Sequence, residues 1–90
     1  MENLQFISEL GTSDFESSLL VQRAYRDFAY GVDIMEYGFN KNTGYVYIAL
    51  ENGVTIASCF GQEVDYITND FETGEEYFFE EYNEALSSLK

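Results

Sequence analysis

Residues 33–60 form three β-rich runs separated by two short turns, and this pattern constrains the fold more than any other feature of the chain. The first turn, 40–44, is rich in Asn and Gly, and the second, 51–53, contains Asn-Gly. Asn-Gly between β-rich runs is a strong hairpin signal, because both residues accept the positive backbone angles of tight hairpin turns. We therefore expect an antiparallel meander of three strands, formed by residues 33–39, 45–50 and 54–60. Residues 64–68 predict a fourth strand at an edge of the sheet.

Helical patterns lie before this region. Spacing of apolar residues over 2–10, followed by Gly11, predicts a short helix. Ser13-Asp14-Phe15-Glu16 then has the form of a capping box, in which a hydroxyl and a Glu three residues later satisfy free N–H groups at a helix start. A helix over 14–30 follows, with Arg23 and Arg26 near its edge. Its expected buried stripe is Leu20, Val21, Ala24, Tyr25 and Phe28.

A second capping-box pattern, Thr73-Gly74-Glu75-Glu76, predicts that a helix runs from there to the C-terminus. Glu76, Glu80 and Glu84 recur every four residues and would form a charged stripe on its outer side. The expected inward stripe is Phe78, Tyr82, Ala85, Leu86 and Leu89.

The chain is 90 residues long, contains no proline and shows no linker-like segment, so we expect a single domain over 1–90. Hydrophobic residues make up 46% of it, which is too apolar for a disordered acidic tail. The predicted fold class is α+β, with a three- to four-stranded antiparallel β-meander packed with an N-terminal and a C-terminal helix.

The strongest functional signal is a run of acidic residues between 63 and 84 that contains no Lys, Arg or His. Its members are Glu63, Asp65, Asp70, Glu72, Glu75, Glu76, Glu80, Glu81 and Glu84. Concentrating so many like charges in one small region costs stability through self-repulsion. We therefore expect these residues to bind a basic surface on another protein.

The same charge excludes other classes of function. With 17 acidic and 4 basic groups, the chain lacks the clustered Lys and Arg needed to bind nucleic acid directly or to bind an anionic membrane.

The expected location of the protein is the cytoplasm. Neither a signal peptide nor a membrane-spanning stretch is recognisable in the sequence. The single Cys59 is expected to be a buried structural residue.

The sequence offers few of the features that catalysis needs. Without His, the chain lacks the commonest general base near neutral pH and the commonest zinc ligand. A catalytic carboxylate pair needs a substrate cleft that a domain of this size has little volume to form. The segment 70–76 alternates oxygen ligands but lacks the complete pattern of a calcium loop. We therefore predict no enzyme activity, no cofactor and no metal site.

Charge density points to one particular use of the acids. Duplex DNA carries about one charge per 1.7 Å of its axis, and 17 acids across a domain of this size match that density. Tight binding also needs aromatic anchors in a desolvated centre. The aromatic residues that interleave with the acids are Tyr66, Phe71, Tyr77 and Phe79.

In size, charge and α+β pattern, the chain resembles the small DNA-mimic proteins that phages and mobile elements encode against host defence, including anti-restriction and anti-CRISPR proteins. The resemblance implies a non-enzymatic inhibitor, monomeric or homodimeric, that blocks the basic nucleic-acid-binding surface of a CRISPR effector or a restriction enzyme. An immunity protein that neutralises a basic nuclease toxin is the main alternative. An acidic adaptor, an antagonist of histone-like proteins and a merely solvated surface also remain open.

Overall fold

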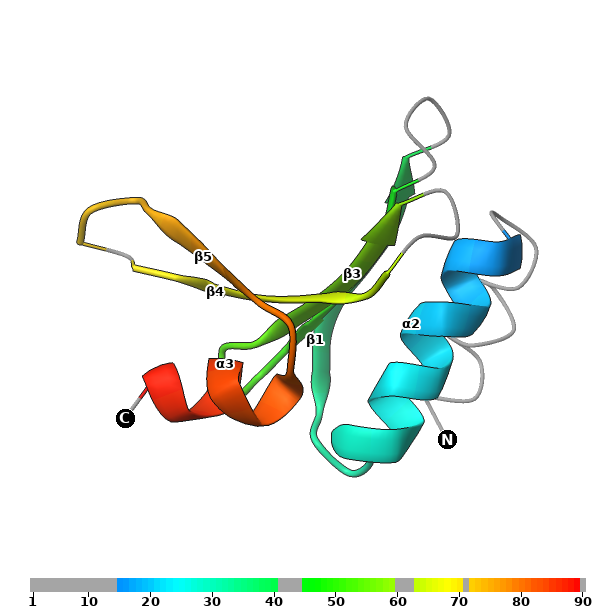
Figure 1. Ribbon diagram of the computed structural model, residues 1–90, viewed down its shortest axis with the longest axis horizontal. Helices are drawn as coiled ribbons and strands as arrows, with labels where there is room; N and C mark the ends of the chain where they lie inside the picture. The colour runs from blue at the N-terminus through cyan, green and yellow to red at the C-terminus, as the bar shows by residue number, and fades with distance from the viewer. Residues whose placement is uncertain (1–14, 41–44, 60–62, 71, 90) are drawn as a thin grey trace.

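The computed structural model describes residues 15–40, 45–59, 63–70 and 72–89 (Figure 1). Strands that follow one another in the sequence also lie side by side in the sheet. In chain order the elements are α2 (Phe15–Phe28), β1 (Ile34–Asn40), β2 (Tyr45–Leu50), β3 (Thr55–Cys59), β4 (Asp65–Asn69), β5 (Glu76–Phe79) and α3 (Tyr82–Ser88). The strands form one antiparallel sheet in the order β1-β2-β3-β4-β5. The α+β class is therefore confirmed, with five strands in the sheet.

Both helices contribute to one hydrophobic core on the same side of the sheet. Helix α2 packs against β2 and β3, whereas α3 packs against β4 and β5. Alternate residues of β2 point toward the helices, because side chains of a strand alternate between its two faces. Val46, Ile48 and Leu50 are buried there, together with Tyr25 of α2 and Ala85 of α3.

The predicted meander is confirmed. The registers join β1 to β2 and β2 to β3 in antiparallel pairs, and Gly53 takes a positive φ of 100° in the second turn. The loop 41–44, the helix predicted over 2–10 and the capping residues Ser13 and Asp14 lie outside the described residues. The strand predicted over 64–68 is β4, but it is not at an edge, because β5 pairs with its free side.

The prediction of three to four strands is wrong, because residues assigned to the C-terminal helix form β5. Tyr77, Phe78 and Phe79 have strong β propensity, and pairing with β4 supplies the backbone hydrogen bonds that a helix would have made internally. Only Tyr82–Ser88 is helical. The stripe of Glu76, Glu80 and Glu84 consequently does not exist, since only Glu84 lies in the helix.

The two predicted buried stripes are partly correct. Helix α2 buries Val21, Ala24 and Tyr25, and α3 buries Tyr82 and Ala85. Three further stripe residues remain exposed: Phe28 at 56%, Phe78 at 63% and Leu89 at 41%. Phe78 points away from the helices because it belongs to a strand, while Phe28 and Leu89 lie at the ends of their helices, where the core stops.

Three aromatic rings join the ends of α2, β4 and α3. The ring of Phe28 lies edge-on to Tyr66 at 6.3 Å between centroids and is stacked on Tyr82 at 6.4 Å, and Tyr66 contacts Tyr82 at 6.0 Å. Aromatic pairs at such separations add about 0.5–1.5 kcal/mol beyond the area they bury. Half-exposed Phe28 therefore still contributes to holding the two helices against β4.

Candidate functional site

The acidic run folds into a projecting hairpin and the short helix behind it. Strands β4 and β5 extend away from β1–β3, with their connecting loop at the far end (Figure 1). Eight of the nine carboxylates are exposed, and only Asp70 is half-buried. The structure therefore places the predicted acidic residues at the surface, although on a hairpin rather than along a helix.

Asp70 organises the loop at the tip of this hairpin. Its Oδ1 accepts hydrogen bonds from the backbone N–H groups of Glu72, at 2.9 Å, and Thr73, at 3.4 Å. Its carbonyl oxygen accepts from the N–H of Gly74, and its own N–H donates to the carbonyl of Glu75. An Asp that bonds its own following backbone in this way fixes a turn. No group of three potential metal-ligating side chains gathers in this loop or elsewhere in the part of the chain that the structure describes.

The two faces of the hairpin carry different predicted residues. Tyr77 is paired with Thr68 across the strands, on the face that looks toward the helices. Glu76 is paired with Asn69 and therefore points to the opposite face. Asp65 shares this opposite face, because its pairing with Ala57 is one residue away from that of Tyr66, which faces the core.

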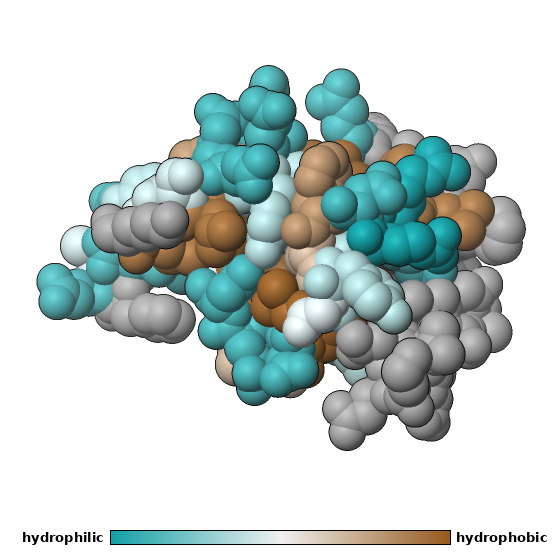
Figure 2. Space-filling view, turned by 90° about the horizontal axis from the view of Figure 1, so that it is seen from below, coloured by the Kyte–Doolittle hydropathy of each residue, from teal (hydrophilic) through white to brown (hydrophobic). Residues whose placement is uncertain are grey.

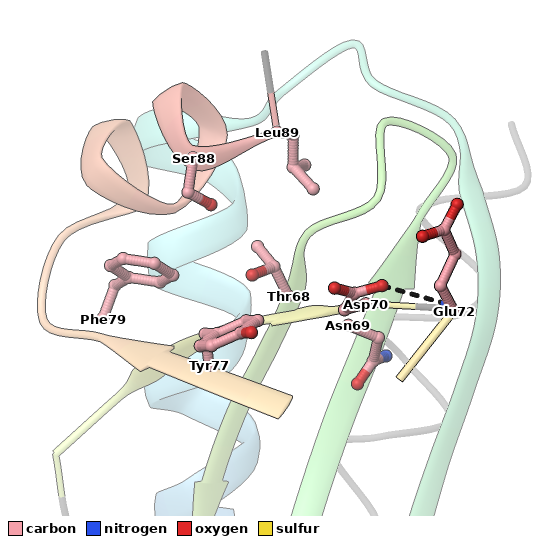
Figure 3. A pocket seen from close by; sticks show the side chains of 8 residues that line it. All are labelled: Thr68, Asn69, Asp70, Glu72, Tyr77, Phe79, Ser88 and Leu89. Atoms are coloured by element: carbon pink, nitrogen blue, oxygen red, sulfur yellow. Dashed lines mark hydrogen bonds between the residues drawn. The ribbon is translucent and has the colours of Figure 1, made fainter. Parts of the chain in front are cut away.

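A groove separates the hairpin from the C-terminal end of α3 on the helix side (Figure 3). It has a volume of about 640 Å³, and we call it the hairpin groove. Its lining residues are Thr68, Asn69, Asp70, Glu72, Tyr77, Phe79, Ser88 and Leu89. Asp70, Glu72 and Tyr77, all predicted as partner-binding residues, are brought together here.

Other predicted acids gather elsewhere. Glu63, Asp65 and Glu80 line a second hollow of about 410 Å³ with Val64 and Tyr66. Glu81 precedes α3 as its N-cap residue, and Glu84 lies exposed in its first turn. The predicted partner surface is thus divided between the groove, this hollow, the start of α3 and the opposite face of the hairpin, where Glu76 lies.

The predicted aromatic anchors have different positions. Tyr66 is buried, only 5% exposed, so its assignment as a surface anchor is wrong: its ring belongs to the core, and burial raises the pKa of its hydroxyl. Phe71 lies outside the described residues. Tyr77 is 44% exposed and its hydroxyl donates a 2.8 Å hydrogen bond to Glu75, which raises the pKa of Tyr77. Phe79 is half-buried in the groove.

Phe78 was not predicted as a partner-binding residue, yet it is the most exposed aromatic residue in the part of the hairpin that the structure describes. It lies opposite Ile67 on the face away from the helices, whereas Tyr77 lies on the groove face. The run Tyr77-Phe78-Phe79 contained a signal for this, since consecutive aromatic residues in a strand must point to alternate faces.

Hydrophilic and hydrophobic residues are interleaved on the surface seen from below (Figure 2). No helix of the described chain is long and apolar enough to cross a membrane. Comparison of the chain with protein-family models, with curated proteins and with solved structures finds no match. A function has to be inferred from the geometry and charge of the surface itself.

Proposed function

We propose that this protein is a non-enzymatic inhibitor that mimics nucleic acid and blocks the basic DNA- or RNA-binding surface of a host defence nuclease in the host cytoplasm. The nuclease would be a CRISPR effector or a restriction enzyme. The observation that carries the proposal is the β4–β5 hairpin, which displays carboxylates on both faces together with exposed aromatic rings.

The dimensions of the molecule support mimicry. Its longest extent is 34 Å, a length over which duplex DNA carries about 20 charges at one per 1.7 Å. The chain offers 17 acidic side chains, with a net charge of -13. A basic channel that accommodates a duplex would therefore meet a comparable charge over a comparable length.

The hairpin has the features of an anchor as well as those of a charged surface. Tyr77 is exposed on one face and Phe78 on the other, each next to carboxylates. Charge speeds association by steering, while affinity depends on a few aromatic or arginine residues in a desolvated centre. A surface that served only solubility would gain nothing from exposed aromatic rings among its acids.

The test is a competition experiment on a captured partner. The chain is immobilised, basic proteins are captured from host lysate at low salt, and each is purified and assayed for nucleic-acid binding and cleavage. The proposal predicts that the chain abolishes both at about one molecule per enzyme and that excess substrate nucleic acid restores binding. Capture of a toxin nuclease encoded beside this chain would instead identify an immunity protein.

Matched variants separate a specific surface from net charge. Glu72→Gln, Glu75→Gln and Glu76→Gln together remove three negative charges from the hairpin. Asp27→Asn, Asp33→Asn and Glu51→Gln together make the same change in charge at exposed positions outside the acidic run. Inhibition should be lost in the hairpin triple variant and retained in the control triple variant. Equal inhibition by both would show that the hairpin is not the working surface.

A further inference from the structure

We propose that the hairpin groove is a receptor for an arginine side chain of the basic partner. This inference rests on the proposed function and specifies which chemical group of the partner is recognised. Four features of the groove support it: a buried hydroxyl, two carboxylates, an aromatic ring and a wall fixed by packing.

The buried hydroxyl belongs to Thr68, at the floor of the groove. Thr68 is only 2% exposed, and the structure gives its hydroxyl no hydrogen-bond partner among the described residues. Every fully enclosed side-chain oxygen or nitrogen in the described chain has a hydrogen-bond partner. Since the Thr68 hydroxyl has none there, it is not fully enclosed and must reach the space of the groove. Figure 3 shows it directed there. A hydroxyl that opens onto the groove can accept a hydrogen bond from a ligand that donates one.

Two carboxylates, those of Asp70 and Glu72, give the groove negative charge. Asp70 uses Oδ1 to hold the loop, which leaves Oδ2 without a hydrogen bond in the described part of the chain. Glu72 is exposed at the same end of the groove. The described residues that line the groove include these two carboxylates and neither Lys nor Arg, so this lining is negatively charged. A cationic group that donates hydrogen bonds fits both the carboxylates and the hydroxyl of Thr68.

The ring of Tyr77 favours arginine over lysine as the occupant. It is paired with Thr68 across the strands and is 44% exposed, so that it forms part of the groove lining (Figure 3). A planar guanidinium stacks on an aromatic ring and presents several donors at its edge, whereas an ammonium is a compact, strongly hydrated charge. One guanidinium could therefore stack on Tyr77 while donating to Asp70.

Packing holds the opposite wall in place. Leu89 follows α3 and lines the groove, and its side chain lies so close to Gly53 that a Cβ there would be 3.0 Å from Cδ1 of Leu89. The Asn52 side chain also donates a 2.7 Å hydrogen bond to the hydroxyl of Tyr82 in α3. The turn between β2 and β3 thus fixes the helix whose end forms the wall, so the groove exists before a ligand arrives.

The test uses the whole chain, labelled with ¹⁵N, and two probe peptides of equal length, one of arginine and one of lysine. Arginine peptide should shift the amide resonances of Thr68, Asn69 and Tyr77 in a saturable way and bind more tightly than lysine peptide. Equal affinities, or shifts spread evenly over all acidic segments, would overturn the proposal.

Single substitutions test the separate roles of Asp70 and Tyr77 in the groove. Asp70→Asn keeps an oxygen for the loop but removes the charge, and should weaken arginine binding about threefold to fivefold, more than the matched Glu84→Gln on α3. Tyr77→Leu should abolish the preference for arginine, whereas Tyr77→Phe, which keeps the ring, should preserve it. If Asp70→Asn and Glu84→Gln weaken binding equally, the acids act only as a diffuse field and the groove is not the receptor.

These measurements need no host partner, so the two proposals fail separately. Arginine-selective binding with no captured nuclease would support the groove and contradict the proposed function. Inhibition of a captured nuclease that is unaffected by Asp70→Asn and Tyr77→Leu would support the function and contradict the groove.

Discussion

Asn52 and Tyr82 are 30 residues apart in the sequence and are joined by a hydrogen bond of 2.7 Å from the Asn52 amide to the Tyr82 hydroxyl. Asn52 also uses its side-chain oxygen to accept a hydrogen bond from the backbone N–H of Val54, which fixes the turn between β2 and β3. Tyr82 is buried at the start of α3. One side chain therefore fastens both a hairpin turn and the C-terminal helix.

Removal of the Tyr82 hydroxyl should measure this connection. Tyr82→Phe keeps the buried ring but leaves the amide of Asn52 without its acceptor, so we expect a loss of about 1 kcal/mol in the free energy of unfolding. Tyr77→Phe removes an exposed hydrogen bond and should change stability by less than about 0.5 kcal/mol. Denaturant unfolding of both variants checks the prediction, and equal losses would contradict it.

Gly38 is required by the ring of Tyr47 on the neighbouring strand. The two residues are paired between β1 and β2, and a Cβ at position 38 would lie 2.7 Å from Cε1 of Tyr47. Tyr47 is also stacked on Tyr45, with ring centroids 5.8 Å apart. We expect Gly38→Ala to displace the Tyr47 ring and to cost about 1–3 kcal/mol, as overpacking usually does.

A double-mutant cycle tests the cause of that loss. If the clash is with Tyr47, Gly38→Ala should cost much less in a Tyr47→Ala background, and the difference is read from denaturant unfolding of the four proteins. Additive losses would show that the glycine is needed for another reason.

The sequence predicted the parts of the fold that local patterns determine. Apolar spacing located α2, and the alternation of residues around Asn52-Gly53 located the strands β2 and β3. The prediction failed at β5 because the capping-box pattern that begins at Thr73 does not distinguish a helix start from a turn. The Thr73 hydroxyl accepts a hydrogen bond from the N–H of Glu75 within a turn, as it would at a helix start.

The residues of the candidate site could be predicted in part from the sequence, but their grouping in space could not. That Asp70, Glu72 and Tyr77 are surface residues follows from their types and their neighbours. Their grouping with Ser88 and Leu89 depends on α3 folding back beside β4 and β5, a tertiary contact that no local pattern encodes. Tyr66 was misplaced because its acidic neighbours do not decide which way it points: it lies on the core-facing side of β4.

Buried tyrosines should make the fold sensitive to alkaline pH. Burial raises the pKa of Tyr25 and of Tyr66 above its usual value of about 10, with nearby Asp27 adding to the effect at Tyr66. The folded state therefore holds these protons more tightly than the unfolded state. Their contribution to stability is fully present below pH about 10 and is lost as pH rises through the folded-state pKa values.

Loss of the helical signal in circular dichroism should accordingly coincide with the last phase of the rise in tyrosinate absorbance, above pH about 10, in which the buried tyrosines ionise. Tyr66→Phe removes one of the ionising groups and should move the unfolding transition to higher pH. A transition that stays in place or moves to lower pH in this variant would exclude Tyr66 as a cause.

Added salt should stabilise the protein, because the carboxylates of the hairpin repel one another. The Debye length falls from about 30 Å at 0.01 M salt to about 10 Å at 0.1 M, and the longest extent of the molecule is 34 Å, so this change screens charges at opposite ends of it. We expect the Tm to rise over this range, by about 4–8 °C if screening contributes about 1 kcal/mol. The Glu72→Gln, Glu75→Gln and Glu76→Gln triple variant should melt higher at low salt and respond less to added salt. A Tm that falls with salt in the unmodified protein would mean that attractive ion pairs, rather than repulsion among the acids, dominate its electrostatics.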